Sequence, residues 1–268
     1  MKKSKYFYCI FLAMVINCAP SIQVIYKDAS YTAGSIQNYS TVGINILPNI
    51  TVWEFKNAFK RQFETKERFV DIMRLNVQKE FNNILNCPNV VIDSSQPPEY
   101  TSPIIETSTI DLSNSQESDV EVSFNDKYLK VFKDYIKSKK EAFYFIIRGI
   151  DIGNEKTIHN GTTINNLPLG KGNISGTTTY STEDCKVRIY AELWDVKENR
   201  IMVSFCSIGS GTVFIAFYKT ALNQAINDAI VKMLLYLKTG SIYPSTIIPD
   251  SSRSRSQSDI FNDKVASH

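Results

Sequence analysis

The amino-acid sequence predicts an α/β fold, built as an α+β sandwich in which a mixed sheet of about five strands packs with about three helices. Three patterns predict it. Residues 41–92 run in the order strand, helix, strand; residues 186–208 alternate as two strands joined by a turn; and residues 221–237 form one apolar helical stripe. This order of elements is typical of a sheet covered by helices.

The first strand is expected at residues 41–47, where every second side chain is apolar and the apolar set shares one face (Val42, Ile44 and Ile46). Residues 66–85 carry apolar side chains at helical spacing, and Pro88 follows this helix because proline cannot continue it. A further helical segment is predicted at residues 53–63, ahead of the main helix. A second strand is predicted directly after that helix, at residues 90–92.

Residues 127–140 read as an amphipathic helix, and residues 142–152 are dense in Phe, Tyr and Ile, as in a central strand. The alternation over residues 186–196 turns one set of side chains toward a core (Val187, Ile189, Ala191 and Leu193) and the other set outward (Lys186, Arg188, Tyr190, Glu192 and Trp194). Residues 201–208 return as its partner, and the glycine-containing residues 209–211 are expected to break that strand.

The closing helix has the clearest pattern, an apolar stripe that ends at Gly240. Three small side chains on that stripe, Ala221, Ala225 and Ala229, predict that the helix lies close against the sheet.

Four polar segments interrupt or flank this α/β domain, which is expected over residues 41–238. Residues 18–40 read as a tether, residues 93–125 as a flexible insertion and residues 239–268 as a disordered tail, because such compositions bury too little apolar surface to offset the entropy of ordering. Residues 154–180 read as a hairpin extension or a mobile loop.

The amino terminus has the pattern of an export signal over residues 1–17. Lysines in the first five residues precede an uncharged apolar run at residues 6–16. This run has 11 residues, whereas a membrane-spanning helix needs roughly 20. We therefore expect the segment to be removed.

The stretch Val15-Ile16-Asn17-Cys18 resembles the lipobox of bacterial lipoproteins, with Asn17 where that pattern has Gly, Ala or Ser. The resemblance implies that the signal is cut before Cys18 and that the Cys18 thiol is diacylated. More than one acyl chain gives a stable membrane anchor. The expected location is the bacterial cell envelope, and the outer membrane is favoured over the inner membrane. The alternatives are a secreted protein or a retained signal anchor.

Three cysteines remain after Cys18, at positions 87, 185 and 206. The predicted hairpin places Cys185 opposite about residue 212 and Cys206 opposite about residue 191. The two sulfur atoms would then lie too far apart for a disulfide, so all three are expected to be buried thiols.

Charge and chemistry exclude several function classes. The chain has 30 basic and 27 acidic residues, so no overall field favours nucleic acid. Only His159 and His268 could serve a His-dependent triad or metal site, and a loop position is expected for His159. The carboxylate pairs 183/184 and 151/155 read as solvated strand ends. No enzyme activity, metal or cofactor is predicted.

Two aromatic side chains, Tyr190 and Trp194, share the outward face of the strand at residues 186–196. Exposed aromatic residues are enriched at interface hot spots, which makes both candidate partner-binding residues. Helices that cover both faces of the sheet would instead bury them in a core.

Residues 41–238 resemble the α/β domain shared by curli secretion-channel lipoproteins, lipoprotein activators of penicillin-binding proteins, and the TolB amino-terminal domain. The resemblance lies in element order and in loosely spelled stretches such as residues 42–48 and 187–196. It implies a domain without an active site that works through protein contacts. The expected function is therefore an envelope lipoprotein that binds another envelope protein during assembly or activation of that partner.

The alternative is an oligomeric secretion or export component of the curli-channel type. Members of that group insert two hairpins into the membrane, the second between the last strand and the last helix. Here residues 209–220 are too short for the second hairpin, and residues 154–180 are too polar for lipid-facing strands.

Overall fold

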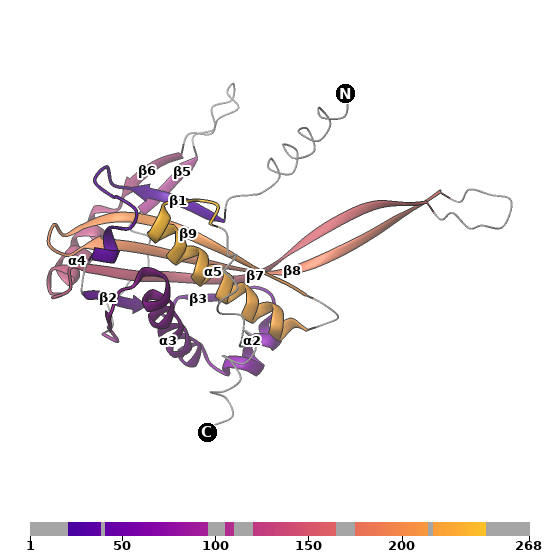
Figure 1. The fold of residues 1–268 in the computed structure, drawn as a ribbon, viewed down its shortest axis with the longest axis horizontal. Helices are drawn as coiled ribbons and strands as arrows, with labels where there is room; N and C mark the ends of the chain where they lie inside the picture. Colours follow the sequence, from indigo (N-terminus) through magenta and orange to yellow (C-terminus); the bar gives the residue numbers. More distant parts are fainter. Residues whose placement is uncertain are drawn as a thin grey trace, which may run out of the picture.

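The structure, a computed structural model, describes residues 21–38, 41–95, 105–109, 120–164, 175–213 and 217–244. Its centre is a seven-stranded mixed sheet with the order β1-β9-β8-β7-β2-β4, and β3 also pairs with β7 (Figure 1). Neighbouring strands β4, β2 and β7 are parallel, as are β3 and β7, and the other pairs are antiparallel. The strands are β1 (Ile22–Lys27), β2 (Thr41–Ile46), β3 (Ile50–Val52), β4 (Asn89–Ile92), β7 (Phe143–Ile164), β8 (Ser175–Asp195) and β9 (Arg200–Thr212).

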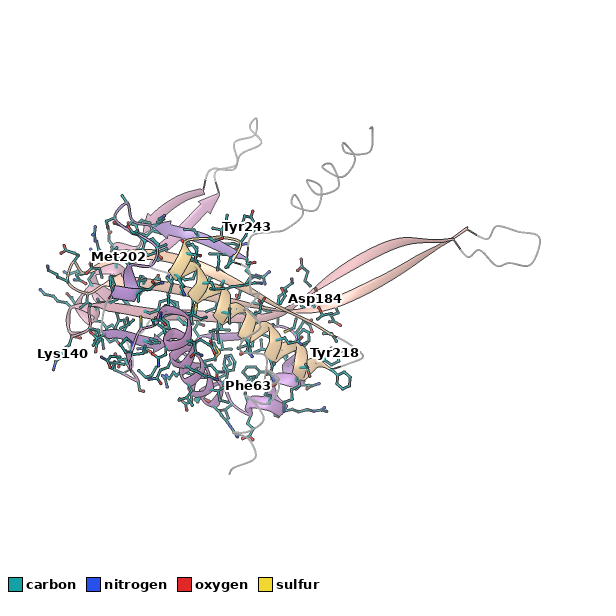
Figure 2. All side chains as sticks on the ribbon, in the orientation of Figure 1. Phe63, Lys140, Asp184, Met202, Tyr218 and Tyr243 are labelled. Atoms are coloured by element: carbon teal, nitrogen blue, oxygen red, sulfur yellow. The ribbon has the colours of Figure 1, made fainter. Side chains whose placement is uncertain are left out.

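Helices pack on both faces of this sheet. One face is covered by three helices, whose apolar side chains share the larger core with alternate strand residues such as Ile189 and Leu193 (Figure 2). A fourth helix covers part of the other face, around Trp194. The helices are α2 (Lys56–Phe63), α3 (Lys66–Leu85) and α5 (Tyr218–Thr239) on the first face and α4 (Asp126–Lys137) on the second, with the short 3-10 helix η1 at Ser35–Asn38. The predicted α/β class is confirmed, with more strands and helices than expected.

Helix α5 lies unusually close to β9 because each contributes small residues to the contact. A Cβ atom built at Gly209 would lie 2.0 Å from the carbonyl oxygen of Ala225, and one built at Gly211 would lie 1.9 Å from that of Ala221. The expectation that residues 209–211 break the strand is wrong, because β9 continues through them to Thr212. The glycines instead make room for the helix.

Two segments expected to be unstructured contain strands. Residues 22–27, assigned to the tether, form β1 and pair antiparallel with β9, with Ile22 buried in the core. In the predicted insertion 93–125, β5 (Ile105–Thr109) pairs antiparallel with β6 (Val120–Phe124). The predicted signal, Cys18 and the part of the tail beyond Pro244 lie outside the described residues. In the described start of the tail, the Ile242 carbonyl oxygen accepts a hydrogen bond from the Ile22 amide of β1.

Strands β7 and β8 continue past the body of the domain as a long hairpin, which projects away from the helices (Figure 1). Their register runs from the pair Phe143 and Asp195 to the pair Ile164 and Ser175, with one bulge at Arg148. Residues 154–180 were predicted to be either a hairpin extension or a mobile loop. The hairpin extension is confirmed for the described residues, 154–164 and 175–180.

The three described cysteines are free and buried. Cys185 pairs with Gly211 and Cys206 with Tyr190, each within one residue of the predicted register. Burial raises the pKa of both thiols to about 12. The prediction of buried, unbridged thiols is confirmed.

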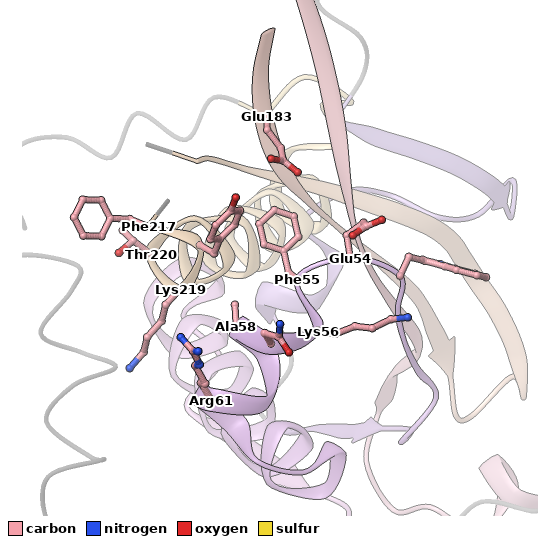
Figure 3. Close-up of a pocket in the computed structure, with 12 residues that line it drawn as sticks. Glu54, Phe55, Lys56, Ala58, Arg61, Glu183, Phe217, Lys219 and Thr220 are labelled. Atoms are coloured by element: carbon pink, nitrogen blue, oxygen red, sulfur yellow. The ribbon is translucent and has the colours of Figure 1, made fainter. Parts of the chain in front are cut away.

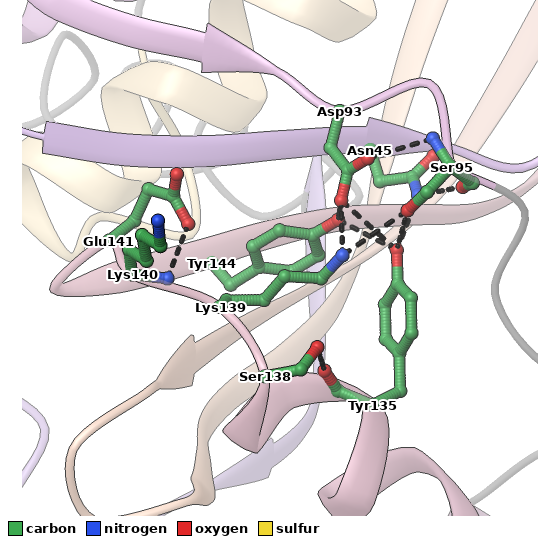
Figure 4. Close-up of polar contacts among 9 residues, drawn as sticks. All are labelled: Asn45, Asp93, Ser95, Tyr135, Ser138, Lys139, Lys140, Glu141 and Tyr144. Carbon is green, nitrogen blue, oxygen red and sulfur yellow. Dashed lines mark hydrogen bonds and ion pairs between the residues drawn. The ribbon is translucent and has the colours of Figure 1, made fainter.

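Helix α4 is fastened to the sheet by a polar cluster around Asp93, which follows β4 (Figure 4). The Oδ2 atom of Asp93 accepts hydrogen bonds from Lys139 Nζ and the Tyr144 hydroxyl, both at 2.5 Å, and from the Tyr135 hydroxyl at 3.2 Å. Burial raises the pKa of Asp93, but the hydrogen bonds from Lys139, Tyr144 and Ser95 outweigh it and hold that pKa well below its usual range.

This cluster predicts a loss of stability in acid. The unfolded chain takes up a proton at Asp93 near pH 4, whereas the folded chain resists it, so the free energy of unfolding falls as the pH drops below about 4. Asp93→Asn should be about 1–3 kcal/mol less stable at pH 7 and should lose less stability in acid. Urea unfolding across pH measures this. The control is Asp134→Asn, at an exposed site on α4. If the free energy of unfolding of wild type and of Asp93→Asn fell in parallel as the pH drops, the prediction would be wrong.

Candidate functional site

An open groove of about 890 Å³ lies where the loop between β3 and α2, the start of α5 and the base of the hairpin meet (Figure 3). The Trp53 amide donates to the Ile152 carbonyl oxygen at 2.9 Å, which ties the loop to β7. The Val213 amide donates to the Glu183 carbonyl oxygen at 3.0 Å, which fixes the end of β9 beside β8. Three segments far apart in the sequence thus form one site.

Four aromatic side chains line this groove. The rings of Phe55 and Tyr218 meet edge to face with centroids 5.5 Å apart. On its rim, Trp53 is 67% exposed and Phe217 is 62% exposed, the two largest exposed fractions among the described large apolar side chains. Large aromatic groups left in water mark binding surfaces more often than single aliphatic residues do.

The backbone at Phe55 is in the left-handed conformation, with φ of 61°. A bulky residue rarely adopts this conformation, which costs of the order of 1–3 kcal/mol. The conformation persists because Phe55 packs against the core while its carbonyl oxygen accepts from the Phe59 amide at 2.8 Å. Strain held at a surface pocket favours a binding role for that pocket.

The groove rests on a rigid base. Three phenylalanines of α2 and α3 form a buried ring cluster, with centroid distances of 4.8–5.2 Å (Phe59, Phe63 and Phe69). The amide Nε2 of Gln62 on α2 also donates to Asn223 Oδ1 on α5. The two helices that begin at the groove, α2 and α5, are thus joined to each other by this hydrogen bond.

Charges of both signs line the groove, and Lys56 extends to the same side of Phe55 as Glu54 in Figure 3. In Figure 3, Glu54 and Glu183 lie on the hairpin side of Phe55, and Arg61 and Lys219 lie on the other side. The first turns of α2 and α5 contain no acidic residue, and neither helix has a side-chain N-cap hydrogen bond among the described residues. Both helix N-termini thus add partial positive charge to the groove.

Trp194, one of the two predicted partner-binding residues, is fully buried. It lies on the predicted outward face, but α4 covers it there, with the Phe132 ring 5.5 Å away by centroids. Its Nε1 atom donates to Glu192 Oε2 at 3.1 Å. The suggestion that Trp194 contacts a partner is corrected, because it belongs to the core between α4 and the sheet.

Tyr190 lies on the same sheet face as Trp194 but is only half-buried. Its hydroxyl donates to Asp151 Oδ2 at 3.2 Å. Burial, together with the nearby Cys206 and Asp151, raises the pKa of Tyr190 to about 12. Tyr190 does not line the groove, so the structure does not bring the two predicted residues together in one site.

The groove itself was missed by reasoning from the sequence. One signal for it exists, because α2 and α5 both begin after a phenylalanine, Phe55 and Phe217, where Ser, Thr, Asp or Asn is the usual N-cap. His159, expected in a loop, has its backbone in β7 opposite Tyr180. Among the described side chains, no three His, Cys, Asp or Glu residues gather to hold a metal ion.

No helix in the described part of the chain is long and apolar enough to span a membrane. No protein-family model matches the sequence, and no curated protein matches it. Among solved structures, the chain is similar to a candidate neuraminyllactose-binding hemagglutinin homologue from Helicobacter pylori, with 9% identity and a TM-score of 0.33. The match covers 88% of this chain and 97% of that chain. A likeness of this size gives no information about function.

Proposed function

We propose that this chain is a lipid-anchored envelope protein that binds a partner protein through the groove and catalyses no reaction. The observation that carries the proposal is the exposed aromatic rim, Trp53 and Phe217, around an open groove whose base is rigid. Burying such rings on association is favourable at roughly 25 cal/mol per Å² of apolar surface. Rigid aromatic groups also lose little conformational entropy when they bind.

Photo-crosslinking in the native membrane tests the groove. The full-length chain carrying Trp53→p-benzoylphenylalanine is expected to give a covalent adduct with one distinct protein on irradiation, because position 53 lies at the rim. The matched control is Val131→p-benzoylphenylalanine, since Val131 is 43% exposed but lies on α4. The same adducts at both positions, or none at position 53, would rule out partner binding at this groove.

The lipid anchor is tested separately. Cys18→Ala removes the thiol that the lipobox-like stretch assigns to acylation, so the variant should keep an unmodified precursor mass. Intact mass measured on membrane-extracted protein should show wild type beginning at Cys18 with added acyl mass. If the variant were instead cut at the same place as wild type, and the two masses differed only by the substitution, Cys18 would not be acylated and the lipid anchor would be refuted.

A second candidate is an oligomeric export component, favoured by the projecting hairpin. Strand β3 pairs with β7 only as far as Val52, opposite Ile152. Beyond Ile152, this edge of β7 pairs with no other described strand, so its backbone groups are available to a strand of another copy. The crosslinking experiment separates the two candidates. An adduct of twice the chain mass would favour copies of this chain, and an adduct of any other mass would favour a different partner.

A further inference from the structure

The folded domain starts very soon after the cysteine that is expected to carry the acyl chains. Strand β1 begins at Ile22, and the Ser21 carbonyl oxygen already accepts a hydrogen bond from the Ile208 amide of β9 at 2.8 Å. Cys18 precedes Ile22 by four residues, which span at most about 14 Å when fully extended. The lipid head groups take up about 5–7 Å of that distance.

Such a short link limits which side of the domain faces the membrane. A domain of about 200 residues has a radius of gyration of about 16 Å, so the link is too short for the far side of the domain to reach the bilayer. The surface next to Ile22 is therefore the part of the domain that an acylated Cys18 holds at the membrane.

Two segments form this surface, residues 21–24 at the start of β1 and residues 239–244 after α5, which we call the anchor corner. The Ile22 amide donates to the Ile242 carbonyl oxygen at 3.2 Å, which joins the two segments. Figure 2 shows Tyr243 beside β1, at the opposite end of α5 from Tyr218. The anchor corner is therefore separate from the groove, which lies at the start of α5.

The anchor corner exposes apolar side chains and carries no charge. Val24 is 40% exposed, Ile242 is 39% exposed and Tyr243 is 54% exposed. Neither of the two segments contains an acidic or basic residue. This composition suits the bilayer interface, where tyrosine is enriched and an ionised side chain is costly. The lining of the groove, by contrast, contains acidic and basic side chains.

Hydrogen bonds hold the second segment in a defined conformation. The Gly240 amide donates to the Tyr236 carbonyl oxygen at 2.7 Å, where α5 ends. The Ser241 amide then donates to Thr239 Oγ1 at 3.2 Å, and the Tyr243 amide donates to Ser241 Oγ at 3.3 Å. The exposed side chains of the anchor corner are thus presented by ordered backbone.

We infer that the anchor corner lies on the membrane surface, with Val24, Ile242 and Tyr243 among the lipid head groups beside the acylated Cys18. This inference rests on the lipid anchor of the proposed function and adds how the domain is oriented on that anchor. Apolar side chains at the interface add to the membrane affinity that the acyl chains give. The groove then lies at the other end of α5, a helix of 22 residues that is about 33 Å long.

Photo-crosslinking to lipid in the native membrane tests the inference. The full-length chain carrying Tyr243→p-benzoylphenylalanine is expected to form an adduct with a membrane lipid, detected as the added mass of one lipid on the peptide that contains position 243. The matched control is Val91→p-benzoylphenylalanine, because Val91 is 44% exposed but lies on β4, at the opposite edge of the sheet from β1. The control should give no lipid adduct.

A second substitution in the crosslinking chain tests the apolar contact. Ile242→Asp places a carboxylate at the interface, so the yield of the lipid adduct at position 243 should fall at least about fivefold. Val91→Asp in the same chain should leave the yield unchanged. Equal thermal unfolding of the two variants shows that a lower yield does not come from misfolding.

Equal lipid adducts at positions 243 and 91, no lipid adduct at position 243, or an adduct there with a protein in place of a lipid would overturn the inference. The intact mass of the same sample separates this failure from failure of the anchor. If Cys18 carries acyl mass, the proposed function stands and only the orientation is wrong. If Cys18 is unmodified, the anchor and the orientation are both removed.

Discussion

Replacing Gly211 with alanine is expected to lower the free energy of unfolding by at least about 3 kcal/mol. The added Cβ would lie 1.9 Å from the Ala221 carbonyl oxygen and 3.0 Å from the Ala225 amide nitrogen. Both are backbone atoms of α5, so no side-chain rotation relieves the clash. The helix must move off β9, and its buried stripe loses contact with the core along its length.

Urea unfolding followed by tryptophan fluorescence measures this effect in the full-length protein, because the buried Trp194 becomes exposed on unfolding whereas Trp53 is already 67% exposed. The matched control is Gly153→Ala in β7, where a Cβ atom would meet no heavy atom within 4 Å. That change should stay within about 0.5 kcal/mol of wild type. Equal losses for the two variants would show that α5 does not lie on β9 as described.

Removing the charge of Arg148 is expected to have the second large effect. Arg148 Nη1 contacts Glu192 Oε1, and the Glu192 side chain is 0% exposed. Arg148→Met would leave a buried carboxylate without its arginine, which costs about 3–5 kcal/mol. The Trp194 Nε1 donor remains at 3.1 Å, but one neutral hydrogen bond does not balance a buried charge.

The double variant Arg148→Met with Glu192→Leu supplies the control. Because it removes both charges, it should recover most of the stability that the single variant loses, and the midpoint of urea unfolding gives the comparison. Arg188→Met, at an exposed site on the same sheet face, should have little effect. A double variant as unstable as Arg148→Met would refute the pairing.

Several elements could be predicted from the sequence because their patterns are local. Residues 66–85 form α3 with the predicted bounds, and α5 ends at Gly240, whose φ of 73° suits a residue without a Cβ atom. Strand β1 was overlooked because only Ile22 in it is fully buried, so its pattern resembles a surface segment. The β5 and β6 pair lies in polar sequence, where periodicity is weak.

The candidate site could not be predicted in the same way. Trp53, Glu183 and Phe217 line one groove although more than 100 residues separate the first two. No local pattern relates such positions, because their proximity depends on how β3, β8 and α5 pack. Sequence reasoning did identify Glu183, but as a solvated strand end and not as part of a groove.

Local sequence patterns specify the type of each main element and the face on which each strand residue lies, because side-chain spacing of 2 or 3.6 residues is a property of the local backbone. Tertiary structure alone decided which positions on a face are covered. Tyr190 and Trp194 share a face of β8, yet α4 buries only Trp194. Burial depends on which distant element packs there, and that is fixed by the fold as a whole.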